Sequence, residues 1–206
     1  MIVVPPGGGE VVGDAPDRRV EILSDHDALT VTWSRFGPGR EGADLHVHYH
    51  HTDLFYVLEG ELTVRLGVED ELVSARAGTL VRIPPLVVHG FRNASAADVK
   101  YLNLHAPGAG FADYMRKISD FDQFDPPADG VRPTSEVGIG RPGELADGPE
   151  LAASEVAAPF ERESQDALQA AYVLDGERVG TWLQAPPGTP LEVDGDGRLL
   201  LLRAPG

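Results

Sequence analysis

Residues 45–60 read LHVHYHHTDLFYVLEG, and this stretch decides the predicted fold. Four of the seven histidines of the chain fall within it. His46 and His48 are two residues apart, and on a β-strand such side chains project from the same face. Both imidazoles can therefore point toward one place in space. The apolar run that follows, residues 54–58, contains the aromatic and branched residues that favour a strand.

A carboxylate and a further histidine accompany this pair. Asp53 lies five residues beyond His48. On an unbroken strand it would face the opposite side, so it can join the histidines only if the chain bends around residues 49–52. His89 follows in the stretch GTLVRIPPLVVHGFRN, residues 78–93. Because imidazole and carboxylate are ligands of divalent transition metals, these residues predict a metal site.

The composition is that of an acidic globular protein. The chain has 206 residues, 42% hydrophobic and 24% charged, with a formal net charge of -16. Such a surface repels phosphate backbones, so we expect no nucleic-acid partner. We find no apolar run long enough to span a bilayer and no signal-peptide pattern in residues 1–10, so we expect no membrane association and a cytoplasmic location. The lack of cysteine restricts a metal site to nitrogen and oxygen ligands.

The order of apolar segments predicts the architecture. Many short segments separated by glycine and proline turns precede His105, which indicates an all-β barrel or sandwich. In residues 111–124 the apolar positions recur at intervals of three and four, which predicts one amphipathic helix packed on the barrel. A connector rich in proline and glycine covers residues 125–150. We therefore expect a barrel over residues 1–125 and a smaller, β-rich part over residues 126–206.

The histidine stretch resembles the first motif of the cupin superfamily. That motif is a glycine, five residues, H-x-H, three or four residues, a glutamate, six residues and a glycine. His46, His48 and Gly60 match it at the expected spacing. Two departures stand out, because Asp53 replaces the glutamate and Arg40 stands at the position of the leading glycine.

The downstream stretch resembles the second cupin motif, G-x5-P-x-G-x2-H-x3-N. Gly78, Pro84, His89 and Asn93 match, while Leu86 stands where the motif has its second glycine. The resemblance covers roughly residues 29–105. Two spaced motifs strongly predict the cupin fold, but they predict function only weakly, because this fold serves enzymes, binding proteins and storage proteins.

The resemblance implies a jelly-roll barrel, a double-stranded β-helix, with a metal inside it. By this resemblance the four metal ligands are His46, His48, Asp53 and His89. The metal would be Fe, Mn, Ni, Cu, Co or Zn, since a mixed nitrogen and oxygen site suits each of them. Aspartate is one methylene shorter than glutamate, so Asp53 either approaches through the bend or holds the metal weakly or through water. His48 with His50 stays an alternative pair, and otherwise we expect His50 and His51 to face solvent or to adjoin the ligands.

A fainter repeat indicates a second cupin half. Residues 56–61, YVLEGE, return as residues 172–177, YVLDGE. Aligned on this repeat, residues 126–206 keep no set of metal ligands. We therefore expect a degenerate, metal-free half, which would make the chain a bicupin. A coincidental repeat in an unrelated tail is the alternative.

Inward-facing residues of the barrel would contact a ligand. The candidate pocket residues are Phe55, Phe91, Asn103 and His105. Asn103 and His105 alternate on one strand, which also fits an ordinary solvent face. Arg35 and Arg82 would anchor an anion only if they pointed inward.

Function divides into three hypotheses. The first is a metal-dependent oxidoreductase, a dioxygenase like the quercetin-dioxygenase cupins, acting on a small organic molecule; a metal-dependent isomerase belongs to the same class. No catalytic acid or base is evident. The second is a non-catalytic barrel that binds or senses a small molecule, and the last is a structural barrel without metal. A chain with two halves could be self-sufficient or could form a homodimer, and the sequence leaves both open.

Overall fold

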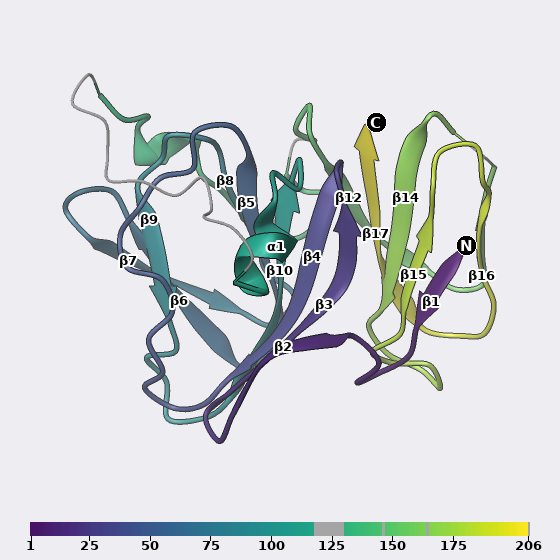
Figure 1. Ribbon diagram of the computed structural model, residues 1–206, viewed down its shortest axis with the longest axis horizontal. Coiled ribbons are helices and arrows are strands. Elements are labelled where there is room, and N and C mark those ends of the chain that lie inside the picture. The colour runs from purple at the N-terminus through teal and green to yellow at the C-terminus, as the bar shows by residue number, and fades with distance from the viewer. Residues whose placement is uncertain (118–129, 146, 164, 206) are drawn as a thin grey trace.

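The computed structural model describes residues 1–117, 130–145, 147–163 and 165–205. Its strands form two halves that lie side by side, with the earlier part of the chain in one and the green and yellow C-terminal strands in the other (Figure 1). The predicted all-β fold with one short helix is confirmed. No helix among the described residues is long and apolar enough to cross a bilayer.

The first half is a sandwich of a large and a small sheet. The large sheet has the order β11-β8-β5-β10-β4-β3-β2, and the small one has the order β7-β6-β9. The large sheet contains β2 (Glu10–Ala15), β3 (Arg18–His26), β4 (Leu29–Phe36), β5 (Thr52–Glu59), β8 (Leu80–Ile83), β10 (Val99–Ala106) and β11 (Gly138–Gly140). The small sheet contains β6 (Glu61–Leu66), β7 (Glu71–Arg76) and β9 (His89–Arg92).

The second half repeats this plan on a smaller scale. A five-stranded sheet has the order β1-β15-β14-β17-β12, and β13 pairs with β16. The larger sheet contains β1 (Ile2–Val4), β12 (Ala152–Ala157), β14 (Ala167–Val173), β15 (Trp182–Ala185) and β17 (Arg198–Pro205). The pair is β13 (Phe160–Arg162) with β16 (Leu191–Val193), and a 3-10 turn (Thr134–Glu136) precedes β11.

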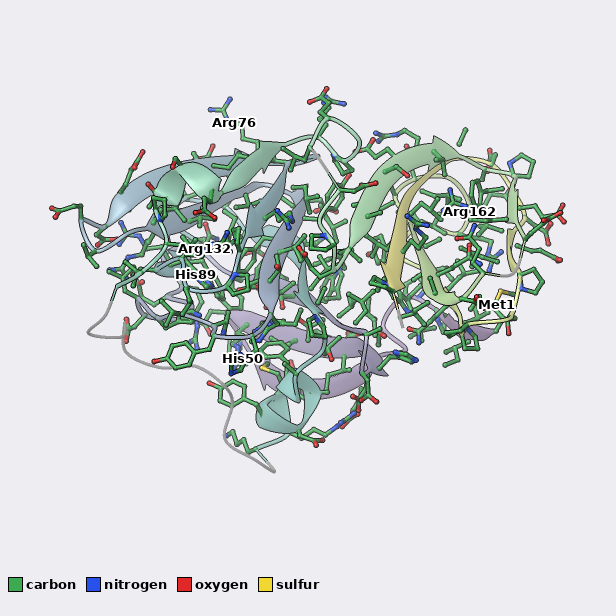
Figure 2. The ribbon with its side chains drawn as sticks, turned by 90° about the horizontal axis from the view of Figure 1, so that it is seen from above. Met1, His50, Arg76, His89, Arg132 and Arg162 are labelled. Atoms are coloured by element: carbon green, nitrogen blue, oxygen red, sulfur yellow. The ribbon has the colours of Figure 1, made fainter. Side chains whose placement is uncertain are left out.

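The two halves exchange strands. The N-terminal β1 leaves the first half and pairs with β15, so Met1 lies in the same half as Arg162 (Figure 2). In the other direction, β11 lies within the connector and pairs with β8 of the first half. Each half thus completes a sheet edge of the other.

Alternation along β10 explains how one strand serves two cores. Leu102 and Leu104 belong to an apolar layer between the two large sheets, together with Leu168 and Leu200 of the second half. Tyr101 points the other way, into the interior of the first sandwich. Because both faces of the large sheet are covered, the apolar and polar residues of β10 are almost all buried. The interior side is the one that carries the polar site.

The helix is shorter than predicted. Helix α1 (Phe111–Met115) covers the open end of the first sandwich, near β4 and β10 (Figure 1). The helix begins at Phe111 as predicted, but its expected continuation past Met115 is wrong, because Lys117 takes a positive φ of 61° and ends the helical path. Residues 118–124 lie outside the described residues.

Candidate metal centre

Paired backbones bring His46 and His89 together. The N–H of His46 donates to the carbonyl oxygen of His89, and the N–H of His89 donates to that of His46, each at 2.9 Å. Leu86 donates in the same way to the carbonyl oxygen of His48 at 2.8 Å. The histidine stretch therefore lies antiparallel to the segment before β9, which turns the side chains of both motifs into the barrel.

The predicted bend before Asp53 is present. Residues 49–51 form bends, and β5 begins at Thr52. Asp53 is the second residue of this strand, where it is register partner to His105 on β10. Its side chain faces the same interior as the histidines, and the residue is 2% exposed. Without the bend, Asp53 and His48 would project from opposite faces of one strand. The bend allows both side chains to face the same interior.

Two backbone carbonyls define the tautomers of two histidines. Nδ1 of His46 is 2.6 Å from the carbonyl oxygen of Asp44, and Nδ1 of His89 is 2.8 Å from that of Val87. A carbonyl oxygen only accepts hydrogen bonds, so each Nδ1 carries the proton and each Nε2 keeps a lone pair. This arrangement is the one found behind metal-binding histidines.

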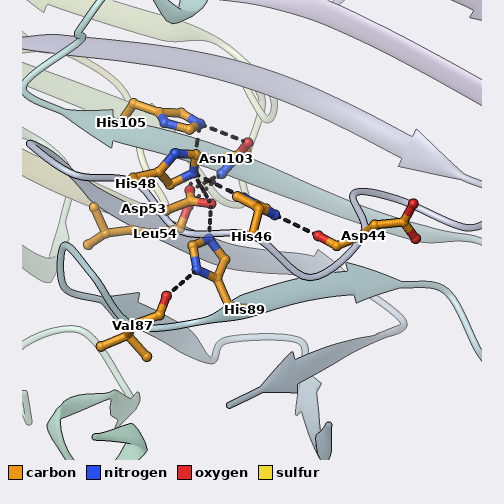
Figure 3. Close-up of polar contacts among 9 residues, drawn as sticks. All are labelled: Asp44, His46, His48, Asp53, Leu54, Val87, His89, Asn103 and His105. Atoms are coloured by element: carbon orange, nitrogen blue, oxygen red, sulfur yellow. Dashed lines mark hydrogen bonds and ion pairs between the residues drawn. The ribbon is translucent and has the colours of Figure 1, made fainter. Parts of the chain in front are cut away.

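The lone pairs converge on one point. Nε2 of His46 lies 3.2 Å from Nε2 of His48, and Nε2 of His89 lies 3.2 Å from Oδ2 of Asp53 (Figure 3). Nε2 of His48 is 3.7 Å from the same oxygen. One donor atom from each of these four side chains lies within 4.8 Å of all the others. The four candidate ligands are thus brought together.

The protonation states of these donors favour binding of a cation. Burial first, and then the charges of His89 and His48, lower the pKa of His46 to about 3. Burial of Asp53 acts to raise its pKa, but the imidazoles of His105, His48 and His89 outweigh it and hold the pKa well below its usual value. Near neutral pH, a neutral imidazole and a carboxylate anion therefore face the same point. Three nitrogen donors and one oxygen donor with no thiolate fit a divalent transition metal.

The other two histidines of the stretch occupy the two kinds of place expected for them. His50 is exposed, so the alternative pair of His48 with His50 is not brought together. His51 is 1% exposed and its ring centroid lies 4.2 Å from that of His48, so of the two expectations for it the structure has the one beside the ligands. Burial first, and then the charge of His48, lower its pKa to about 3. Donor atoms of His48, His51 and His105 form a second group within 4.8 Å.

A cavity of about 280 Å³ opens beside the centre. Phe91, Asn103 and His105 line it, as predicted for pocket residues. Phe55 does not line it and instead packs behind Phe91, with ring centroids 4.9 Å apart. The ring of His105 stacks on Phe111 of helix α1 at a centroid distance of 3.6 Å. Aromatic rings therefore form one part of a mixed cavity wall.

The two arginines considered from sequence lie elsewhere. Arg35 pairs with Asp98 at 3.2 Å and Arg82 pairs with Glu150 at 2.5 Å, so neither enters this cavity. Among the cavity residues that sequence reasoning missed are Arg18, Ser34, Arg40, Glu41 and Tyr101. Tyr101 lies two residues before Asn103 on β10, so the alternation that selected Asn103 could also have selected it.

A larger cavity of about 680 Å³ lies between the two halves, away from the metal centre. Tyr56 and Tyr172, the matching residues of the sequence repeat, both line it. Several of its charged side chains pair with acids, as Arg198 does with Asp175 at 2.7 Å. Of these two cavities, the one beside the histidines has both space for a ligand and a group of candidate metal ligands.

Comparisons with known proteins identify the class. Residues 32–105 match the family model of the cupin domain. The chain is 28% identical over 120 residues to quercetin 2,3-dioxygenase of Bacillus subtilis (strain 168), a match that covers 57% of this chain and 34% of that protein. The chain thus spans about a third of the length of this relative.

Solved structures extend the likeness to the whole chain. The bacterial pirin YhhW of Escherichia coli, solved in complex with nickel(II), matches with a TM-score of 0.69 and 12% identity over 99% of this chain and 98% of that one. A salicylate 1,2-dioxygenase of Pseudaminobacter salicylatoxidans matches with a TM-score of 0.64 and 16% identity, covering 98% and 83%. These likenesses show the fold. Residues 32–105 match the cupin domain model, and the histidines and Asp53 within and near the cavity form a group that could hold a metal.

Proposed function

We propose that the chain is a metal-dependent oxidoreductase of the dioxygenase type that acts on a small organic molecule. His46, His48, Asp53 and His89 would hold one divalent transition metal. The observation that carries the proposal is the convergence of four donor atoms within 4.8 Å at the wall of a cavity. Sequence likeness to a quercetin dioxygenase and structural likeness to a salicylate dioxygenase support the oxidative class.

The residues behind the ligands orient the site. Nδ2 of Asn103 donates to Oδ1 of Asp53 at 2.5 Å and to the carbonyl oxygen of Leu54 at 3.2 Å. The amide oxygen of Asn103 must then face Nε2 of His105, which lies 3.2 Å away and donates its proton to it. This chain of hydrogen bonds leaves Oδ2 of Asp53 directed at the histidines (Figure 3).

These contacts suggest separate roles for the metal and for the residues around it. A bound metal with open positions would supply Lewis-acid or redox chemistry to the substrate. The aromatic wall of Phe91 and Phe111 limits water beside that position. Burial lowers the pKa of His105 well below its usual value, so its imidazole stays neutral and keeps the orientation of Asn103.

Oxygen consumption tests this proposal. The protein would be loaded separately with Fe²⁺, Mn²⁺, Ni²⁺ and Zn²⁺ and screened with phenols, diols and keto acids. We expect substrate-dependent oxygen uptake with at least one redox-active metal, none with Zn²⁺, and none in a His89→Ala variant. Metal binding without oxygen uptake under all of these conditions would contradict the proposal and identify a non-catalytic binding barrel.

We further propose that residues 126–206 are a metal-free cupin-like half. In the repeat alignment Gln169 takes the place of Asp53, and Leu191 takes the place of His89. Gln169 is buried and donates to the carbonyl oxygen of Glu163 at 3.1 Å, while Leu191 is fully buried among apolar residues. Ser164, aligned with His48, lies outside the described residues. Among the residues that the structure describes, the groups of metal-ligating side chains all lie in the first half.

A further inference from the structure

Two arginines line the same cavity as the metal centre. Arg18 is the first residue of β3, and Arg40 lies in the loop after β4. The cavity that they line also contains His46, His48 and Asp53. Glu41 also lines the cavity but is paired with Arg92 at 3.6 Å, and Asp53 belongs to the metal centre, so the two arginines favour an anionic group beside them.

The guanidinium groups keep donors available. Within the described parts of the chain, Arg18 has neither an ion pair nor a side-chain hydrogen bond. Arg40 uses Nη1 for an exposed contact with Asp17 at 3.1 Å. Its Nε–H is buried and has no hydrogen-bond partner among the described residues. A buried donor without a partner is costly, and a ligand that accepts its hydrogen bond would remove that cost.

The loop that carries Arg40 is held firmly. Nδ2 of Asn93 donates to the carbonyl oxygens of Phe36 at 3.0 Å and of Gly37 at 2.9 Å. The backbone N–H of Asn93 donates to the carbonyl oxygen of Arg40 at 2.9 Å. Arg40 stands where the first cupin motif has a glycine, so this guanidinium is a departure of this chain from the general pattern.

Strand register separates the arginines from the metal centre. On β4, Thr32 is register partner to Asn103, and Phe36, four residues on, is register partner to Arg18. Four residues along a strand span roughly 13 Å between Cα atoms. The long side chain of Arg18 shortens this gap, which leaves room for about one ring between the guanidinium and the metal ligands.

The walls between these two ends suit an aromatic ring. Phe36 and Tyr101 meet edge to face at a centroid distance of 5.4 Å, and Phe91 lies 5.9 Å from Tyr101. Tyr101 lines the same cavity as Arg18 and Arg40. The cavity volume of about 280 Å³ lies just below the range of pockets for drug-sized ligands, which favours a single-ring molecule.

We propose that this cavity binds a small aromatic monocarboxylate, with its carboxylate held by Arg18 and Arg40 and the opposite edge of its ring directed toward the metal centre. The inference rests on the proposed function of the same site, because it names the substrate class. Guanidinium groups match a planar carboxylate better than any other side chain does.

The test compares benzoate with benzamide, which has the same shape without the charge. Calorimetric titration into Zn²⁺-loaded protein measures binding without turnover. We expect benzoate to bind at least tenfold more tightly than benzamide. Arg18→Met and Arg40→Met should each weaken benzoate binding at least fivefold, with metal content unchanged. Arg76→Met is the matched control, because Arg76 is exposed on β7, points away from His89 and should leave both affinities unchanged (Figure 2).

Three outcomes would overturn the inference. Equal binding of benzoate and benzamide, or no binding of either, would remove the anion site. Benzoate affinity that is lost in His48→Ala but retained in both arginine variants would place the carboxylate on the metal. The comparison of benzoate with benzamide uses only the wild-type protein. It therefore tests the inference even if a variant fails to fold. Discrimination for benzoate without oxygen uptake by any metal form would contradict the oxidative function and leave the anion site standing.

Discussion

Asn103 donates a hydrogen bond of 2.5 Å from Nδ2 to Oδ1 of Asp53, and this contact determines which carboxylate oxygen faces the histidines. The remaining oxygen, Oδ2, lies 3.2 Å from Nε2 of His89. Both residues are buried. The shorter side chain of aspartate thus reaches the site because β5 begins at Thr52, immediately before Asp53. Pairing with β10 holds this part of β5 in place.

Replacing Asn103 with alanine should weaken metal binding by roughly 10- to 100-fold, the usual effect of removing a group that orients a ligand. The carboxylate of Asp53 would lose its fixed orientation while all four donors remained. Competition with a chelator measures the affinity. Gln169→Ala is the control, because it removes an equally buried amide from the second half. Equal metal affinity in Asn103→Ala and wild type would contradict the role of this contact.

The stability of the metal-free protein should fall as the pH decreases from about 7.5 to 5.5. The pKa of His46 and of His51 is lowered to about 3, against 6.5 in the unfolded chain. Between these values the unfolded state binds more protons, so the free energy of unfolding rises with pH across this window. Each histidine contributes roughly 1.4 kcal/mol per pH unit at most.

Urea unfolding in the presence of a chelator, at both pH values, measures this effect. A His46→Gln variant removes one titrating group and should show a smaller difference between the two pH values. A metal-free protein that is equally stable at pH 5.5 and 7.5 would contradict the burial of neutral imidazoles.

The two halves should unfold in one transition. They share an apolar layer and exchange β1 and β11. Leu168→Ala, a truncation in the second half, should lower the free energy of unfolding by about 2–5 kcal/mol. The midpoint of thermal unfolding in calorimetry and the midpoint of metal release should both shift, and by the same amount, in Leu168→Ala. Val179→Ala, at an exposed position, should change stability by less than about 0.5 kcal/mol. Two transitions, with metal release unaffected by Leu168→Ala, would show independent halves.

Much of the site could be predicted because it depends on local spacing. The interval of two between His46 and His48 fixes a shared strand face, and the match to both motifs points to Asp53 and His89. Asn103 and His105 followed from the same alternation on one strand. Strand parity requires a bend before Asp53 if this residue joins the histidines, and the structure contains that bend.

Other features depend on contacts that no local pattern encodes. Arg18 reaches the cavity through the register of β3 with β4, and the loop of Arg40 depends on Asn93, more than fifty residues away. His51 follows the exposed His50 but is buried because the chain bends there. The helix ends at Met115 although its apolar periodicity continues, because periodicity does not record a turn at Lys117.

The most direct test of the metal centre is elemental analysis of purified, tag-free protein, with His48→Ala and His50→Ala beside the wild type. His48 points into the donor group, whereas His50 is exposed two residues away. We predict close to one equivalent of a divalent transition metal in wild type and in His50→Ala, and its loss in His48→Ala. Absence of bound metal in the wild type even after reconstitution, or equal metal content in His48→Ala, would contradict the account.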